Sequence, residues 1–258
     1  MKTLVRCLSL LCLLLTLPAC KADGQTVKTY GYRVEETLPH DAGSYTQGLF
    51  FENGVLYESA GQYGQSSFRQ VELKSGRVER RLNFDRRYFA EGSCVLNGRL
   101  FVLTWQEHEC FVYDFKTWEK LGSFRYQGEG WGLTTDGKQL IMSNGTSEIT
   151  FRDPQTFQVQ RSITVTLRGQ KVLYLNELEY IKGEIWANVY GNDQIVRIDP
   201  ATGQVRGVIN LRGILPAQLR TAGTDVLNGI AYDPRSGGIY VTGKYWQKMY
   251  RISLVEKK

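Results

Sequence analysis

Short runs of alternating hydrophobic and polar residues cover most of this chain, and the runs recur at a long, nearly regular interval. Alternation of this kind predicts β-strands that are buried on one face. Similar apolar runs open at Gln47, Glu91, Trp131, Glu177 and Asn228, so the repeat is about 40 to 51 residues long, which is typical of propellers and related arrays of small sheets.

Each repeat predicts a meander of four antiparallel strands. The second repeat has strand-like runs at residues 92–96, 99–104, 109–115 and 121–126. Asn97-Gly98, between its first two runs, is a favoured hairpin turn. The fifth repeat supplies only three strands, whereas residues 29–35 are an extra strand-like segment before the first repeat. We therefore expect an all-β fold, a five-bladed β-propeller of four-stranded antiparallel blades, closed by an N-terminal outer strand.

The N-terminus has the pattern of a secretion signal. Lys2 and Arg6 precede an apolar run at residues 8–17, which is too short to span a membrane. The run ends in Leu-Pro-Ala-Cys, which resembles a bacterial lipobox with Cys20 as the lipid attachment residue. In lipoproteins of this kind, Lys21 after the cysteine indicates the outer membrane. We expect a periplasmic protein of the bacterial envelope, bound to the membrane by its lipid anchor only.

These observations divide the chain into three parts. We expect a signal peptide with a lipobox at 1–20, a linker at 21–28 and a β-propeller domain at 29–258. A plain secretory signal cut near Ala19 or Ala22 is the alternative.

Composition narrows the classes of partner. The 258 residues include 32 basic and 26 acidic side chains, a formal net charge of +6, without a Lys/Arg-rich block. We therefore expect no nucleic-acid partner, and we expect a monomer. His40 and His108 are the two histidines, and no spaced Cys/His set predicts a zinc site. Calcium on the loop at residues 192–193 remains open, as does a disulfide between Cys94 and Cys110.

The propeller geometry predicts where the polar motifs meet. The start of the first strand and the end of the second strand of a meander lie at the same end of the blade. We therefore expect one mouth of the central channel to be ringed by Tyr45, Gln47, Phe89, Glu91, Trp105, Trp131, Asn176, Glu177, Tyr190, Asn228 and Lys244. Aromatic rings, carboxylates, amides and one lysine suit a small polar ligand.

At these positions the chain resembles the glutaminyl-peptide cyclotransferases of plant and bacterial type. The motifs that carry the resemblance are Tyr45-Thr46-Gln47-Gly48-Leu49, Phe89-Ala90-Glu91-Gly92, Val102-Leu103-Thr104-Trp105, Gly130-Trp131-Gly132-Leu133, Leu175-Asn176-Glu177-Leu178-Glu179-Tyr180, Ile185-Trp186-Ala187-Asn188-Val189-Tyr190 and Leu227-Asn228-Gly229-Ile230-Ala231-Tyr232-Asp233. Together they touch every repeat, and the set in this order is far more specific than any one motif.

The resemblance implies a catalytic domain that cyclises the N-terminal glutamine of peptides or proteins to pyroglutamate and releases ammonia, without a metal or other cofactor. It implies that Glu91 is the catalytic acid and base, and that Lys244 and Asn176 orient the amide or stabilise its oxyanion. The implied substrate-binding residues are Gln47, Trp105, Trp131, Tyr45, Phe89 and Tyr190. Tyr190 falls where plant members tend to carry tryptophan, which indicates a different third wall.

Two other classes of function remain at this point. A non-enzymatic propeller lipoprotein could scaffold envelope partners, and it would have no need of Glu91. A propeller lactonase would need a metal at the channel. Ammonia release from a glutamine peptide in the presence of EDTA would favour the cyclotransferase, absence of turnover would favour the scaffold, and metal-dependent ester cleavage would favour the lactonase.

Overall fold

The computed structural model describes residues 26–257, so the expected signal peptide, the attachment residue Cys20 and most of the linker lie outside the described residues. The described chain is almost entirely β-structure, with strands β1 to β22 and one short 3₁₀ turn, η1 (Ala217–Leu219). Within it, no helix has the length and apolar character needed to cross a membrane.

Three successive meanders each form a separate four-stranded sheet. Their strands are β2 (Thr46–Glu52), β3 (Val55–Ala60), β4 (Ser67–Val71) and β5 (Val78–Asn83); β6 (Ala90–Leu96), β7 (Arg99–Thr104), β8 (Glu109–Asp114) and β9 (Lys120–Arg125); and β10 (Leu133–Thr135), β11 (Leu140–Ser143), β12 (Glu148–Arg152) and β13 (Val159–Thr164). Between β6 and β7, Asn97 and Gly98 have φ values of 53° and 72°. Both central residues of the turn are therefore left-handed, as the sequence predicted.

The rest of the chain forms an eight-stranded sheet. A small hairpin, β14 (Thr166–Leu167) and β15 (Gln170–Lys171), precedes it. The eight strands, in sheet order, are β16 (Leu175–Ile181), β17 (Glu184–Val189), β18 (Gln194–Ile198), β19 (Val205–Asn210), β1 (Lys28–Pro39), β22 (Lys248–Lys257), β21 (Gly238–Gly243) and β20 (Leu227–Asp233).

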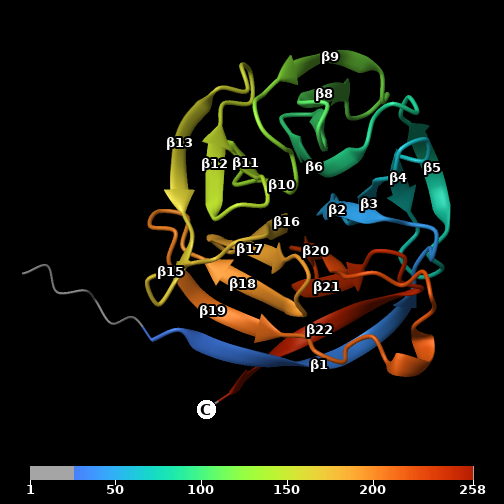
Figure 1. Cartoon of the computed structure of the whole chain (residues 1–258). Helices are drawn as coiled ribbons and strands as arrows, with labels where there is room; N and C mark the ends of the chain where they lie inside the picture. The colour runs from blue at the N-terminus through green and yellow to red at the C-terminus, as the bar shows by residue number, and fades with distance from the viewer. Residues whose placement is uncertain (1–25, 258) are drawn as a thin grey trace, which may run out of the picture.

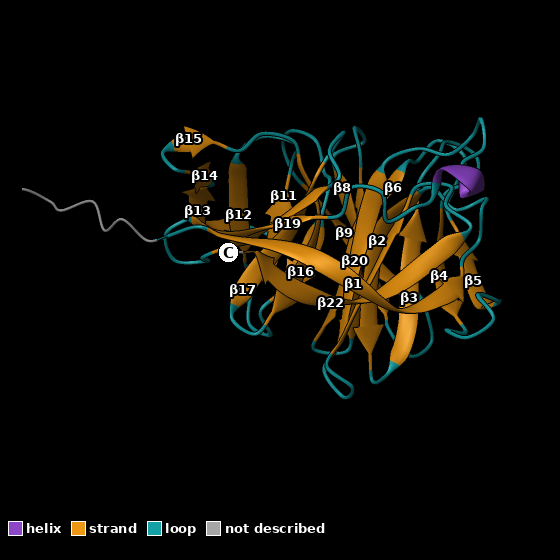
Figure 2. Cartoon of the chain, turned by 90° about the horizontal axis from the view of Figure 1, so that it is seen from below, coloured by secondary structure: helices purple, strands orange, loops and turns teal. Residues whose placement is uncertain are grey.

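Strand β1 joins two meanders within that sheet. It pairs antiparallel with β22 from Thr29↔Lys257 to Pro39↔Lys248, and its first residues pair in parallel with β19. Figure 2 shows β1 and β22 crossing the near side of the molecule together. Residues 29–35, the extra segment of the sequence, therefore lie beside the third strand of the last repeat, as expected.

The strand groups surround a common centre (Figure 1). The first strand of each group is innermost: β2 contacts β6, β6 contacts β10, β10 contacts β16, β16 contacts β20, and β20 contacts β2. Apolar residues fill the wedges between neighbouring sheets, and Phe68, Phe101 and Phe151 have no exposed surface. The fold is therefore propeller-like, with a packed core between the sheets rather than within one sheet.

The two cysteines of the described chain are buried free thiols. Cys94 lies on β6 and Cys110 on β8, and β7 runs between these strands. Neighbouring strands are about 4.8 Å apart, so strands on either side of a third are too far apart for a relaxed disulfide. Burial raises the pKa of both thiols, which leaves them unreactive.

The sequence predicted Glu177 at the mouth of the central channel. Instead, its side chain lies at the centre of the fold and accepts hydrogen bonds from two other innermost strands. Its Oε1 accepts the backbone N–H of Leu49 at 3.2 Å, and its Oε2 accepts that of Ile230 at 2.9 Å. One carboxylate thus ties β16 to β2 and β20. The prediction was wrong because strand position alone does not tell whether a side chain points outward or along the central axis.

Candidate active site

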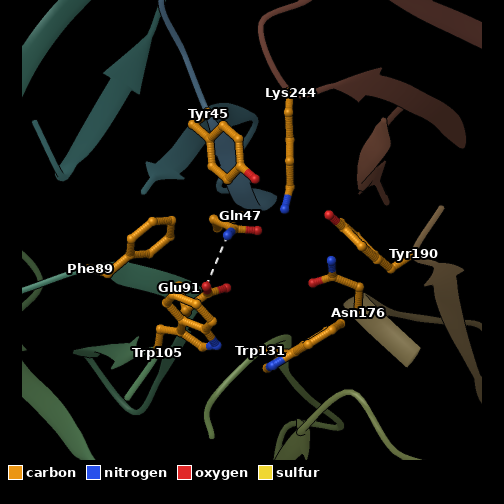
Figure 3. A pocket seen from close by; sticks show the side chains of 9 residues that line it. All are labelled: Tyr45, Gln47, Phe89, Glu91, Trp105, Trp131, Asn176, Tyr190 and Lys244. Atoms are coloured by element: carbon orange, nitrogen blue, oxygen red, sulfur yellow. Dashed lines mark hydrogen bonds between the residues drawn. The ribbon is translucent and has the colours of Figure 1, made fainter. Parts of the chain in front are cut away.

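One cavity brings together all nine residues to which the resemblance gave catalytic or substrate-binding roles. It has a volume of about 270 Å³ and lies where the innermost strands begin. Its lining is Tyr45, Gln47, Phe89, Glu91, Trp105, Trp131, Asn176, Tyr190 and Lys244. Figure 3 shows their side chains pointing towards a common centre.

A repeated irregularity of the innermost strands aims the polar side chains into this cavity. The pairing register shifts between Thr46 and Gly48 in β2, and between Ala90 and Ser93 in β6. The shift recurs between Leu175 and Leu178 in β16 and between Leu227 and Ile230 in β20. A bulge reorients the residue that it contains. The residues inside these four shifts include Gln47, Glu91 and Asn176, which line the cavity, and Glu177 and Asn228, which do not.

Glu91 is held by a chain of two amides. Gln47 Nε2 donates to Glu91 Oε1 at 2.9 Å. Asn228 Nδ2 donates to Gln47 Oε1 at 3.2 Å and to the carbonyl of Thr46 at 2.9 Å. Asn228 therefore fixes which end of the Gln47 amide faces Glu91. The sequence predicted Asn228 at this mouth, but the residue is fully buried, does not line the cavity and acts through Gln47.

The environment of Glu91 favours its neutral form. The side chain is only 4% exposed. Burial raises its pKa well above the ordinary value for glutamate; Lys244 opposes the rise, whereas the carboxylates of Glu129 and Glu107 add to it. A carboxyl group with a raised pKa can both donate and accept a proton near neutral pH.

Lys244 and Asn176 face Glu91 across the cavity (Figure 3). Lys244 is 2% exposed, and none of the salt bridges formed within residues 26–257 includes it. Its Nζ lies 4.4 Å from the ring centre of Tyr45 and 5.1 Å from that of Tyr190. Burial lowers its pKa, although Glu91 and Asp225 oppose the shift.

Asn176 supplies a polar group that no neighbour uses. It is 3% exposed, and its Oδ1 has no hydrogen-bond partner among the described residues. A buried amide without a partner costs free energy, so such groups are retained where a ligand completes them.

Aromatic rings form the wall between these polar groups. The ring centres of Tyr45 and Phe89 are 5.9 Å apart, and those of Phe89 and Trp105 are 5.5 Å apart. On the opposite side, Trp131 lies 5.7 Å from Tyr190, which is 38% exposed. The rings give the cavity largely apolar walls, and Tyr190 marks an open side.

A buried network anchors the start of β2, which carries Gln47 and follows directly after Tyr45. Glu58 Oε1 accepts hydrogen bonds from Ser44 Oγ at 2.6 Å and Thr46 Oγ1 at 2.7 Å, and it pairs with His40 Nε2 at 3.0 Å. Burial acts to raise the pKa of Glu58, but His40, Arg69 and Ser44 hold it at about 2. His40 is thus part of this network, and within residues 26–257 no group of three or more His, Cys, Asp or Glu side chains could hold a metal ion.

The sequence missed Glu129, which contacts two walls of the cavity. Its carboxylate accepts the indole N–H of Trp105 at 2.8 Å and that of Trp131 at 2.9 Å. The available signal was its position two residues before Trp131, in a Gly-Glu-Gly run at the start of a repeat.

Comparisons with known proteins agree with this geometry. The family profile for glutamine cyclotransferase matches residues 7–254. A glutaminyl-peptide cyclotransferase of Arabidopsis thaliana is 46% identical over 223 residues, which is 84% of this chain and 69% of the relative. The crystal structure of Myxococcus xanthus glutaminyl cyclase has a TM-score of 0.84 at 34% identity and covers 90% of this chain and 100% of its own. The WD40 β-propeller domain of Doa1 shares the fold alone, with a TM-score of 0.50 at 13% identity, over 80% of this chain and 62% of its own.

Proposed function

Because the chain belongs to the glutamine cyclotransferase family, we propose that it converts the N-terminal glutamine of peptides or proteins to pyroglutamate and releases ammonia. The observation that carries the proposal is the cavity that gathers Glu91, Lys244 and Asn176 between aromatic walls. A non-enzymatic scaffold gives no reason to bury Lys244 without a salt bridge, or Asn176 Oδ1 without a hydrogen-bond partner, among the described residues.

The reaction is an internal acyl transfer. The α-amino nitrogen attacks the side-chain amide carbon, and a new C–N bond closes a five-membered ring. The C–N bond to the amide nitrogen then breaks, and that nitrogen leaves as ammonia after it has gained a proton. The ordinary pKa of an α-amino group is about 8, so a usable fraction is neutral and nucleophilic near neutral pH.

Glu91 is placed to carry the proton between the two nitrogens. Its raised pKa lets the carboxyl group donate a proton to the departing amide nitrogen. Once ionised, it accepts the proton that the attacking amine loses, so the enzyme ends in its starting state. The hydrogen bond from Gln47 leaves the second carboxyl oxygen of Glu91 for the substrate.

Lys244 Nζ and Asn176 Nδ2 are donors that fit the charge developing on the amide oxygen, whereas the unpartnered Asn176 Oδ1 is left to accept an N–H of the substrate. Attack places a negative charge on the amide oxygen, and donors already in position stabilise it without reorganisation. The Lys244 ammonium is buried and is not taken up by a salt bridge within residues 26–257. The aromatic rings hold the side chain of the substrate in the curled geometry that ring closure requires.

Glu91→Gln tests the proposal directly. Ammonia release from a Gln-peptide in the presence of EDTA should be measurable for the wild type and should fall by about 10²-fold or more in the variant. Glu119→Gln, which removes a carboxylate from the exposed turn after β8, is the matched control and should keep full activity. Absence of turnover by the wild type on any Gln-peptide would refute the function, and an active Glu91→Gln enzyme would remove Glu91 from its role.

The proposal extends to the architecture. We infer five blades closed by β1 as the outer strand of the last blade. The support is the sequence of contacts between innermost strands, which returns from β20 to β2, together with the β1–β22 pairing. A crystal structure with a different number of four-stranded meanders around the centre would contradict it.

The location is a further proposal, and it rests on the sequence alone. A lipid on Cys20 would hold the domain at the periplasmic side of the outer membrane. The wild type should fractionate with outer membranes and Cys20→Ser should not. Equal fractionation of the two proteins would reject lipidation at this residue.

A further inference from the structure

Glu129 connects two walls of the cavity through one side chain. Its Oε2 accepts both indole N–H groups, from Trp105 at 2.8 Å and from Trp131 at 2.9 Å. Its Oε1 accepts the amide N–H of Gln106 at 3.1 Å. Three donors therefore converge on a half-buried carboxylate that does not itself line the cavity.

The aromatic wall is interrupted at this point. One set of ring contacts runs from Tyr45 through Phe89 to Trp105, and another joins Trp131 to Tyr190. Among the ring pairs of the described residues, none joins Trp105 to Trp131. The carboxylate of Glu129 bridges this gap, so the spacing of the two indoles depends on a polar contact rather than on ring packing.

We propose that Glu129 is a positioning and specificity-determining residue, which sets the gap between Trp105 and Trp131 and makes the cavity unfavourable for a substrate with an anionic side chain. The inference rests on the proposed function and adds to it a reason for selecting glutamine over glutamate. Both residues have the same length, and they differ in charge at the atoms that would lie between these walls.

The carboxylate of Glu129 is ionised at neutral pH. Burial acts to raise its pKa, but the hydrogen bonds from Trp131, Trp105 and Gln106 outweigh this and leave the pKa below its ordinary value. Glu107 is a second carboxylate on the same side, held by Tyr63 Oη at 2.8 Å. The negative charge of Glu129 would repel a glutamate side chain in the cavity, whereas it would not repel the neutral amide of glutamine.

Different substitutions separate the charge from the contact. Glu129→Gln keeps an oxygen that can accept both indole N–H groups, if Gln106 turns its amide, but it removes the charge. Glu129→Ala removes both. Trp105→Phe keeps a ring but removes one of the bridged N–H groups. Glu107→Gln is the matched control for the bridge, because it changes a nearby carboxylate that has no hydrogen bond to either tryptophan.

The first measurement is kcat and KM on paired peptides that begin with Gln or Glu. Glu129→Gln should lower the preference for Gln over Glu by about tenfold and should move the limb of the pH profile that reports Glu91 to lower pH. Glu129→Ala should also raise KM for the Gln-peptide by about tenfold, since the walls lose their bridge. An unchanged preference in Glu129→Gln together with an unchanged KM in Glu129→Ala would overturn the proposal.

Tryptophan fluorescence tests the bridge independently of turnover. The chain has five tryptophans, and Trp118, Trp186 and Trp246 are buried, whereas Trp105 and Trp131 are half-exposed. Glu129→Ala should shift the wavelength of the tryptophan emission maximum and increase the quenching of this emission by acrylamide. Glu107→Gln should change neither quantity. Absence of turnover of any Gln-peptide by the wild type would reject the proposed function without rejecting the bridge. Identical emission spectra for the wild type and Glu129→Ala would reject the bridge.

Discussion

Lys244→Met should make the protein more stable and far less active. Lys244 is 2% exposed, and none of the salt bridges within residues 26–257 includes it. Burial lowers its pKa below the ordinary 10.5, which shows that the folded protein disfavours the charge. Methionine keeps an unbranched apolar stem of similar length and removes the ammonium group.

The gain in stability follows from two opposing effects. Replacing poorly compensated buried charges by packed apolar groups commonly stabilises a fold by about 1–4 kcal/mol. The contacts of Nζ with the rings of Tyr45 and Tyr190 offset part of this, by about 1–2 kcal/mol. At the middle of both ranges the net gain is about 1 kcal/mol, which corresponds to a rise in Tm of about 2–4 °C for a domain of this size.

The loss of activity follows from the oxyanion. Removing one preorganised donor to a developing oxyanion costs about 10²–10³ in kcat. Loss of the cation also removes the group that opposes the rise in the pKa of Glu91. The limb of the pH profile that reports Glu91 should therefore move to higher pH in any activity that remains.

Melting curves and ammonia release measured on the same preparations test this reasoning. The unfolded chain binds the Lys244 proton more tightly than the folded protein does. The destabilisation of the wild type by this buried charge is therefore fully present below the pKa that Lys244 has in the folded protein, and it disappears as the pH rises towards 10.5. The Tm advantage of Lys244→Met should therefore be largest near neutral pH and shrink in alkali. A lower Tm with unchanged kcat would refute the argument.

Two further substitutions test the central axis and the amide chain. Glu177→Leu leaves the backbone N–H groups of Leu49 and Ile230 unpaired, at a cost of about 1–3 kcal/mol each. The melting temperature should therefore be highest for the wild type, lower for Glu177→Gln and lowest for Glu177→Leu. A Glu177→Leu protein as stable as the wild type would contradict this role of Glu177. Asn228→Ala frees the amide of Gln47 to rotate, so kcat/KM should fall by about tenfold. Activity equal to that of the wild type would show that Gln47 needs no such support.

Much of the fold and of the cavity lining follows from local pattern. The strands of the second repeat begin and end within two residues of the predicted runs, and Asn97-Gly98 forms the predicted turn. The nine residues to which the resemblance gave roles all line one cavity, because they lie at the start of the first strand or the end of the second strand of their repeats. A repeat that folds the same way each time places equivalent residues around the same centre.

The contacts between repeats depended on the tertiary structure. Glu177 reaches Leu49 across 128 positions in the chain, and Glu129 joins Trp105 to Trp131 although neither indole has a sequence pattern that requires a partner. Strand runs and turns are local, so alternation and turn residues specify them. After the sheets have assembled, a buried carboxylate points towards backbone amides or indole N–H groups that have no other partner. These donors come from more than one repeat, so the sequence of a single repeat does not specify where the carboxylate points.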